Sequence, residues 1–189
     1  MKPLVIFDLD GVLCDFVYGF TGLLLALQGK DLHGAYSTGA QLQWSFDVPG
    51  DVLDNAWNTV NGSEDFWSNL PSLLTEIERQ TLRVAAQQYD LRFLTSRPSS
   101  TARTQSERWL SKQGLLVGPV VVAADKLPLC RALNPVAIID DKPDVITDML
   151  SIGLPVYTRD WSYNRAVVGP RVSSVTEFLH RVHLLTSTQ

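Results

Sequence analysis

Two pairs of aspartates lie where predicted strands end, and their type and spacing suggest chemistry. Asp8 and Asp10 close the first predicted strand, and Asp140 and Asp141 follow the apolar run 136–139. Residues i and i+2 of an extended strand share one side, so Asp8 and Asp10 are expected to lie close together. Neighbouring carboxylates repel one another unless a proton or a cation relieves them, and Mg²⁺ prefers such hard oxygen ligands. The pattern predicts an acidic metal site, although each pair alone also fits an acidic turn or a helix N-terminus.

Polar residues of another kind end two further predicted strands. Thr95, Ser96 and Arg97 follow one apolar run, and Lys126 follows another after a short turn. Hydroxyl groups and backbone amides can hold phosphate oxygens there, and a guanidinium adds a charged fork. A lysine can neutralise both a nucleophilic carboxylate and a transferred phosphoryl group. Alone, these residues would also fit an ordinary loop and a solvated lysine.

Five short apolar runs predict the buried strands that position these residues. The strands are expected at 4–9, 91–95, 120–123, 136–139 and 154–157. Helical patterns lie between them at 75–88, 101–113 and 143–152, and a capping box at 174–177 predicts a last helix that runs towards residue 184. This alternation predicts an α/β fold, a parallel sheet with helices on both faces. Ligands bind such sheets at the carboxyl ends of the strands.

The segment 14–74 breaks the alternation. Its pattern predicts helices at 15–28 and 51–60 and a short one near Phe66, with turn signals at Pro49-Gly50 and Asn61-Gly62. We therefore expect a helical cap at 14–74, inserted over the active site of a catalytic core that comprises residues 1–13 and 75–189.

Composition narrows the classes of partner. The chain has 189 residues, 45% of them hydrophobic and 19% charged, which is typical of globular proteins. Its net charge of −4 argues against a long nucleic acid as the main partner. The longest apolar stretch near the start, 23–27, is too short to span a bilayer, and no signal peptide is visible. Cys14 and Cys130 are expected to be reduced thiols of a soluble, cytoplasmic protein without a membrane partner.

The order of the motifs adds a resemblance. Asp-x-Asp-Gly, Thr-Ser, Lys and Asp-Asp, each after a strand, resemble the motifs of the haloacid dehalogenase-like phosphatase superfamily. The resemblance implies a Rossmann-like core and Mg²⁺-dependent hydrolysis of phosphomonoesters through an aspartyl-phosphate. Asp8 would be the nucleophile and Asp10 the general acid and base. Mg²⁺ would be held by Asp8, by the Asp10 backbone carbonyl, and by Asp140 or Asp141. The phosphate would be held by Thr95, Ser96, Arg97 and Lys126.

A narrower similarity concerns the substrate. The segments 8–16, 66–67, 94–96 and 138–144 resemble the 5'(3')-deoxyribonucleotidases, which implies a small phosphorylated substrate, a nucleoside monophosphate. Phe16 and either Phe66 or Trp67 would then contact the base, although aromatic residues in a helical cap are also ordinary core. The mammalian enzymes of that family lack an arginine after the Thr-Ser motif, so Arg97 departs from their pattern.

The Thr-Ser-Arg segment and its following helix are similar to the phosphatase half of polynucleotide kinases. A polynucleotide 3'-phosphatase is therefore one alternative. A sugar or other small-metabolite phosphatase and a catalytically silent binding module of the same fold are the others.

Overall fold

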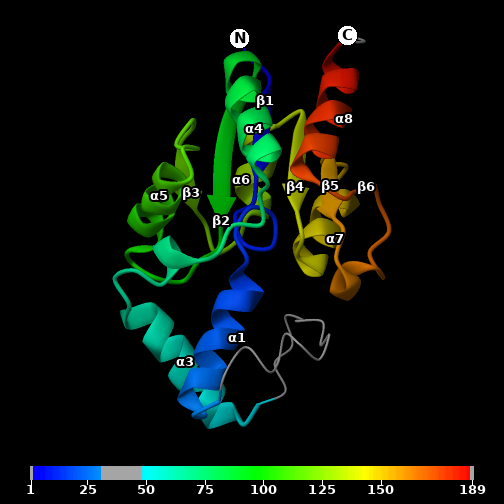
Figure 1. Ribbon diagram of the computed structural model, residues 1–189. Coiled ribbons are helices and arrows are strands. Elements are labelled where there is room, and N and C mark those ends of the chain that lie inside the picture. Colours follow the sequence, from blue (N-terminus) through cyan, green and yellow to red (C-terminus); the bar gives the residue numbers. More distant parts are fainter. Residues whose placement is uncertain (1, 31–47, 188–189) are drawn as a thin grey trace.

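A parallel sheet of six strands forms the centre of the molecule (Figure 1). The computed structural model describes residues 2–30 and 48–187. The strand order is β3-β2-β1-β4-β5-β6. The strands are β1 (Leu4–Phe7), β2 (Asp90–Thr95), β3 (Val120–Val122), β4 (Ala137–Asp140), β5 (Val156–Arg159) and β6 (Arg171–Val172). The expected α/β fold with a Rossmann-like parallel sheet is confirmed, and β6 adds a strand that the sequence pattern did not predict.

The register of the central strands aligns their carboxyl ends. Phe7, the last residue of β1, pairs with Phe93 on one side and with Ile139 on the other. The residues that follow β1, β2 and β4 therefore emerge at one edge of the sheet, where ligands bind in folds of this type.

Alternating side chains of each strand build two cores, one on each face of the sheet. Val5 and Phe7 belong to the core that includes residues of α4 (Glu76–Gln88), α5 (Ala102–Lys112) and α8 (Val175–Ser187). Ile6 belongs to the opposite core, with residues of α6 (Leu127–Leu133) and α7 (Pro143–Ser151). Helices thus cover both faces, and the short α6 is a further element that the sequence pattern did not predict.

Capping fixes where two of these helices begin. Thr75 and Glu78 form a complete capping box at the start of α4. The other carboxylate oxygen of Glu78 accepts a hydrogen bond from the Val175 backbone N–H at 3.0 Å, which ties the start of α4 to the start of α8. At α8, the Glu177 N–H donates to the Ser174 hydroxyl as expected, but the Glu177 carboxylate accepts from the Ser173 N–H and not from that of Ser174.

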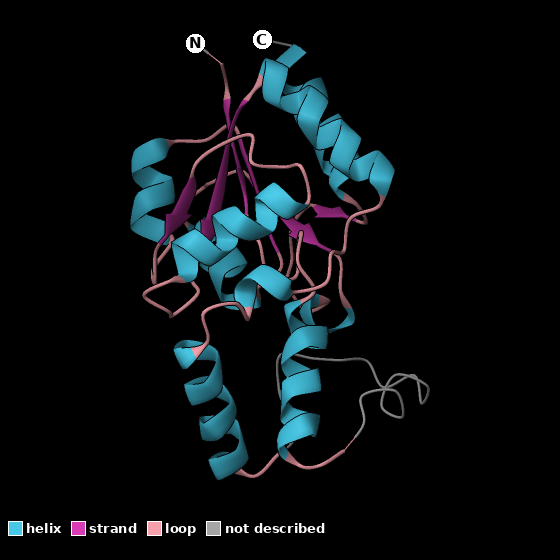
Figure 2. Cartoon of the chain, turned by 60° about the vertical axis from the view of Figure 1, so that its left-hand side comes forward, coloured by secondary structure: helices cyan, strands magenta, loops and turns pink. Residues whose placement is uncertain are grey.

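Two helices lie beyond the carboxyl edge of the sheet and pack side by side, as Figures 1 and 2 show. They are α1 (Phe16–Leu27) and α3 (Gly50–Gly62), and the ring centroids of Phe20 and Trp57 lie 4.6 Å apart between them. The short 3₁₀ helix η1 (Trp67–Asn69) follows. Part of the expected cap, 31–47, lies outside the described residues, and the division into core and cap at residues 14 and 74 stays a prediction. No helix in the described ranges is long and apolar enough to cross a membrane.

Candidate active site

Asp8 lies directly after β1 and is held by two donors. Its Oδ1 accepts from the Leu9 backbone N–H at 2.7 Å and lies 2.8 Å from the Lys126 ammonium. Lys126, at the start of α6, also donates to Asp140 Oδ2 at 2.7 Å, and Asp140 Oδ1 accepts from the Lys142 backbone N–H at 2.9 Å. All three charged side chains are buried. The lysine therefore bridges the ends of β1 and β4.

Burial and charge shift the titration of this group strongly. Burial raises the pKa of Asp8, and the carboxylates of Asp140 and Asp141 raise it further, against the opposing effect of Lys126. Burial alone would lower the pKa of Lys126, but Asp140 and Asp8 more than offset it, so this pKa lies above the usual lysine range. The ammonium stays charged at neutral pH, and three carboxylates still face one cation.

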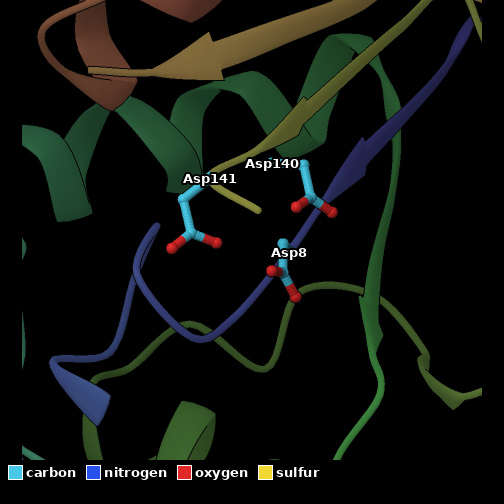
Figure 3. Close-up of side chains that lie close together, drawn as sticks. All are labelled: Asp8, Asp140 and Asp141. Atoms are coloured by element: carbon cyan, nitrogen blue, oxygen red, sulfur yellow. The ribbon is translucent and has the colours of Figure 1, made fainter. Parts of the chain in front are cut away.

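Three buried carboxylates converge at this point, as Figure 3 shows for Asp8, Asp140 and Asp141. One oxygen from each lies within 4.8 Å of the others. The donor set contains only hard oxygen atoms, which suits Mg²⁺ rather than a softer metal. Buried carboxylates this close need either a shared proton or a cation to relieve their repulsion, and a bound cation would meet that need. The residues therefore fit a magnesium ion.

Gly11 makes room for Asp141. Its φ is +75°, and a Cβ built there would lie 2.0 Å from Asp141 Oδ2. Two residues of the loop after β5 also hold Asp141. The Tyr163 hydroxyl donates a hydrogen bond to its carboxylate, and the Asn164 side chain donates to its carbonyl at 2.8 Å. Backbone and loop together thus fix the orientation of this carboxylate.

Asp10 is held by Arg97 in a two-pronged ion pair. Arg97 Nε donates to Asp10 Oδ2 and Nη2 donates to Oδ1, both at 2.8 Å, and the Thr95 hydroxyl donates to Asp10 Oδ2 at 3.3 Å. The guanidinium is buried, bonds the Ser106 hydroxyl at 2.8 Å and lies 4.8 Å from the ring centroid of Trp67. Both prongs therefore point at Asp10, and the expected contact of Arg97 with phosphate stays a prediction.

These groups open into a pocket of about 320 Å³. Its aromatic wall includes the Phe16 ring, which is nearly parallel to the rings of Trp67 (5.5 Å, 18°) and Trp57 (5.9 Å, 21°). Ser96, which is exposed, and Thr95 also line it. Phe66 is not among the lining residues and packs edge-on against Trp67. The structure thus brings together all the expected catalytic, metal and phosphate residues, which are Asp8, Asp10, Thr95, Ser96, Arg97, Lys126, Asp140 and Asp141.

Trp57 is a lining residue that the sequence reasoning missed. Phe16 and Trp67 are almost fully buried, whereas Trp57 is partly exposed, so it offers more ring surface to a ligand. The helical spacing of Leu53, Ala56, Trp57 and Val60 was the available signal, because it places the tryptophan on the apolar face of α3. Whether the expected aromatic residues contact a base stays a prediction.

Comparisons with known proteins bear on the fold and not on the geometry of the site. No family model matches the sequence. A protein of Bacillus cereus, named "Putative nucleotidase", is 23% identical over 185 residues, which cover 90% of this chain and 93% of that protein.

Solved structures resemble this chain in fold over nearly its whole length. A haloacid dehalogenase-like family protein of Streptococcus pneumoniae has a TM-score of 0.64 at 12% identity, over 95% of this chain and 98% of that one. A hydrolase of the same family from Deinococcus radiodurans, solved with bound phosphate and sodium, has a TM-score of 0.59 at 20% identity, over 98% of both chains. A magnesium-bound protein of Bacillus subtilis gives 0.57 at 17% identity, over 96% of this chain and 99% of that one. The chain therefore has the haloacid dehalogenase-like fold, as the sequence motifs indicated.

Proposed function

We propose that this protein is a magnesium-dependent phosphomonoester hydrolase that works through a phosphorylated Asp8, and that its substrates are nucleoside monophosphates. One observation carries the proposal. The buried Asp8 carboxylate lies at the carboxyl end of β1 and forms an ion pair with Lys126. Two further carboxylates that suit a metal lie close to it. The bound phosphate of the Deinococcus radiodurans structure supports phosphate chemistry on this fold.

Asp8, Asp10 and Lys126 have separate roles in an in-line displacement at phosphorus. The Asp8 carboxylate attacks phosphorus, the bond to the leaving oxygen breaks, and an aspartyl-phosphate forms; water then attacks that phosphorus and restores the carboxylate. Asp10 must enter this step protonated, which requires its ion pair with Arg97 to open; it gives that proton to the departing alkoxide and takes one back from the water. Lys126 stays beside Asp8 throughout and offsets the negative charge that gathers on the transferred group.

Magnesium would be held by Asp8, Asp141 and the backbone carbonyl of Asp10. Bound there, it would neutralise the charge that otherwise keeps a carboxylate away from a phosphate. Both oxygens of Asp140 accept hydrogen bonds from this chain, from Lys126 and from the Lys142 N–H, so we assign to Asp140 the positioning of the lysine.

The pocket supports a planar leaving group. Trp57 presents a partly exposed ring beside the phosphate-binding residues, and base–aromatic stacking tolerates any base. The Bacillus cereus relative is named as a nucleotidase, and this name supports the same substrate class. The acidic net charge favours a mononucleotide over a long nucleic acid.

The test is phosphate release by the purified protein, with and without Mg²⁺. The panel contains nucleoside 5'- and 3'-monophosphates, a 3'-phosphorylated oligonucleotide and a sugar phosphate. We expect magnesium-dependent release from the monophosphates, lost in Asp8→Asn and kept in Asp148→Asn, the same change at an exposed position of α7. Release from the oligonucleotide alone would identify a polynucleotide 3'-phosphatase, and release from the sugar phosphate alone would identify a sugar phosphatase. No release from any of them would refute the proposal.

A further inference from the structure

The loop after β5 returns to the site and contacts both motif segments. The Trp161 indole N–H donates to the Gly11 carbonyl at 2.7 Å, in the turn that follows Asp8 and Asp10. The Tyr163 hydroxyl donates to the Asp141 carboxylate. The Asn164 amide donates to the Asp141 carbonyl and to the Arg159 carbonyl, both at 2.8 Å. One short loop therefore reaches the ends of β1 and β4 at once.

The loop is itself held in place. Trp161 and Tyr163 stack with their planes 12° apart, and the Arg159 guanidinium lies 5.7 Å from the Trp161 ring centroid. Arg171 in β6 donates to the Asn164 side chain at 3.0 Å and forms an ion pair with Asp160 at 2.7 Å. These contacts fix the Tyr163 hydroxyl before any ligand arrives.

Tyr163 and Gly11 together leave Asp141 little freedom. The glycine backbone approaches Asp141 Oδ2 so closely that a Cβ would collide with it, and the tyrosine hydroxyl bonds this same oxygen. The carboxylate is fully buried and belongs to the group that converges with Asp8 and Asp140. A hydrogen bond to a ligating carboxylate fixes its orientation and tunes the affinity of a metal.

From this geometry we infer that Tyr163 is a positioning residue for the metal, acting through Asp141, with Trp161 supporting the Gly11 turn beside it. The inference rests on the metal site of the proposed function. It assigns the loop 160–164 a role in loading Mg²⁺ rather than in contacting the substrate. The motifs that suggest the reaction do not include this loop.

The test measures Mg²⁺ binding by isothermal titration calorimetry, without substrate. Tyr163→Phe removes one hydroxyl and keeps the ring that stacks on Trp161. Loss of such a hydrogen-bond partner typically lowers the affinity of a site for its metal about 10–100-fold, so we expect the Kd for Mg²⁺ to rise by that factor. At saturating Mg²⁺, kcat should recover most of its wild-type value. The matched control is Tyr89→Phe, which removes a hydroxyl contact with Thr186 at the opposite edge of the sheet, and it should leave the Kd unchanged.

The outcomes separate this inference from the proposed function. A folded Tyr163→Phe protein that binds Mg²⁺ as tightly as the wild type, or more tightly, would overturn the inference even if the protein is an active phosphatase. A wild type that binds Mg²⁺ but releases no phosphate would remove the proposed reaction and leave the comparison of affinities standing. If Tyr163→Phe does not fold, Trp161→Phe decides, because it removes the hydrogen bond to Gly11; an unchanged Kd there would also overturn the inference.

Discussion

Replacing Gly11 by alanine should damage the metal site more than the fold. The residue adopts φ +75°, where an alanine costs about 1–2 kcal/mol on conformation alone. The new Cβ would lie 2.0 Å from Asp141 Oδ2, far inside van der Waals contact, so the carboxylate must move by at least about 1 Å to restore an ordinary non-bonded separation. That shift strains its hydrogen bond with Tyr163, and loss of a buried bond adds about 1–3 kcal/mol.

Gly153→Ala isolates the contribution of the collision. Gly153 has φ +77°, and no atom lies within 4 Å of a Cβ built there. The two variants therefore share the conformational cost and differ in the contact with Asp141. We expect the free energy of unfolding, measured with urea in the absence of metal, to fall by about 1–2 kcal/mol in Gly153→Ala and by about 2–5 kcal/mol in Gly11→Ala.

Magnesium titrations of the same two variants complete the assay. Gly11→Ala should weaken Mg²⁺ binding at least about tenfold, because the displaced carboxylate is a proposed ligand, and Gly153→Ala should not weaken it. Equal stability and equal Mg²⁺ affinity in the two variants would show that Asp141 is not held against Gly11.

Three further changes test other parts of the site and fold. Arg97→Lys replaces a fork by a point charge, and if the arginine acts through Asp10, kcat should fall about 10–100-fold with KM nearly constant; a raised KM with constant kcat would instead indicate a phosphate contact. Trp57→Leu should raise KM about tenfold for nucleoside monophosphates, because a stacked base contributes about 1–3 kcal/mol, and leave KM for glycerol phosphate unchanged. Glu177→Ala should lower the free energy of unfolding by about 0.5–1 kcal/mol at neutral pH. Hydrogen bonds from Ser173 lower the pKa of Glu177, so this cap stabilises the fold above the usual glutamate range and loses its effect as pH falls through the depressed pKa; urea unfolding at pH 7 and pH 3 checks that the difference narrows.

The positions of the motif residues could be predicted because a parallel sheet imposes them. Asp8, Thr95 and Asp140 come from the ends of adjacent strands, and in-register pairing puts such ends at one edge whatever the loops do. The apolar runs were long enough to locate these strands. In contrast, α6 has seven residues and a proline in its first turn, which is too short for a helical period to show, and β6 has two residues.

Contacts between distant segments could not be predicted. The interpretation of Arg97 as a phosphate ligand followed its place in the motif, but the bidentate pair with Asp10 depends on how the ends of β1 and β2 face each other. The loop 160–164 follows the predicted strand 154–157, yet no periodicity links Tyr163 to Asp141, 22 residues earlier. That link exists because β5 lies beside β4 in the sheet.

The covalent role of Asp8 is tested most directly by trapping the intermediate. Purified protein is mixed with a nucleoside monophosphate and Mg²⁺, quenched in acid within the first turnovers, and digested for peptide mass spectrometry. We predict a phosphate on the peptide that contains Asp8, lost on treatment with hydroxylamine and absent from Asp8→Asn, whose phosphate release should also disappear. Phosphate release at an undiminished rate by Asp8→Asn, without any phosphorylated peptide, would rule out Asp8 as the nucleophile.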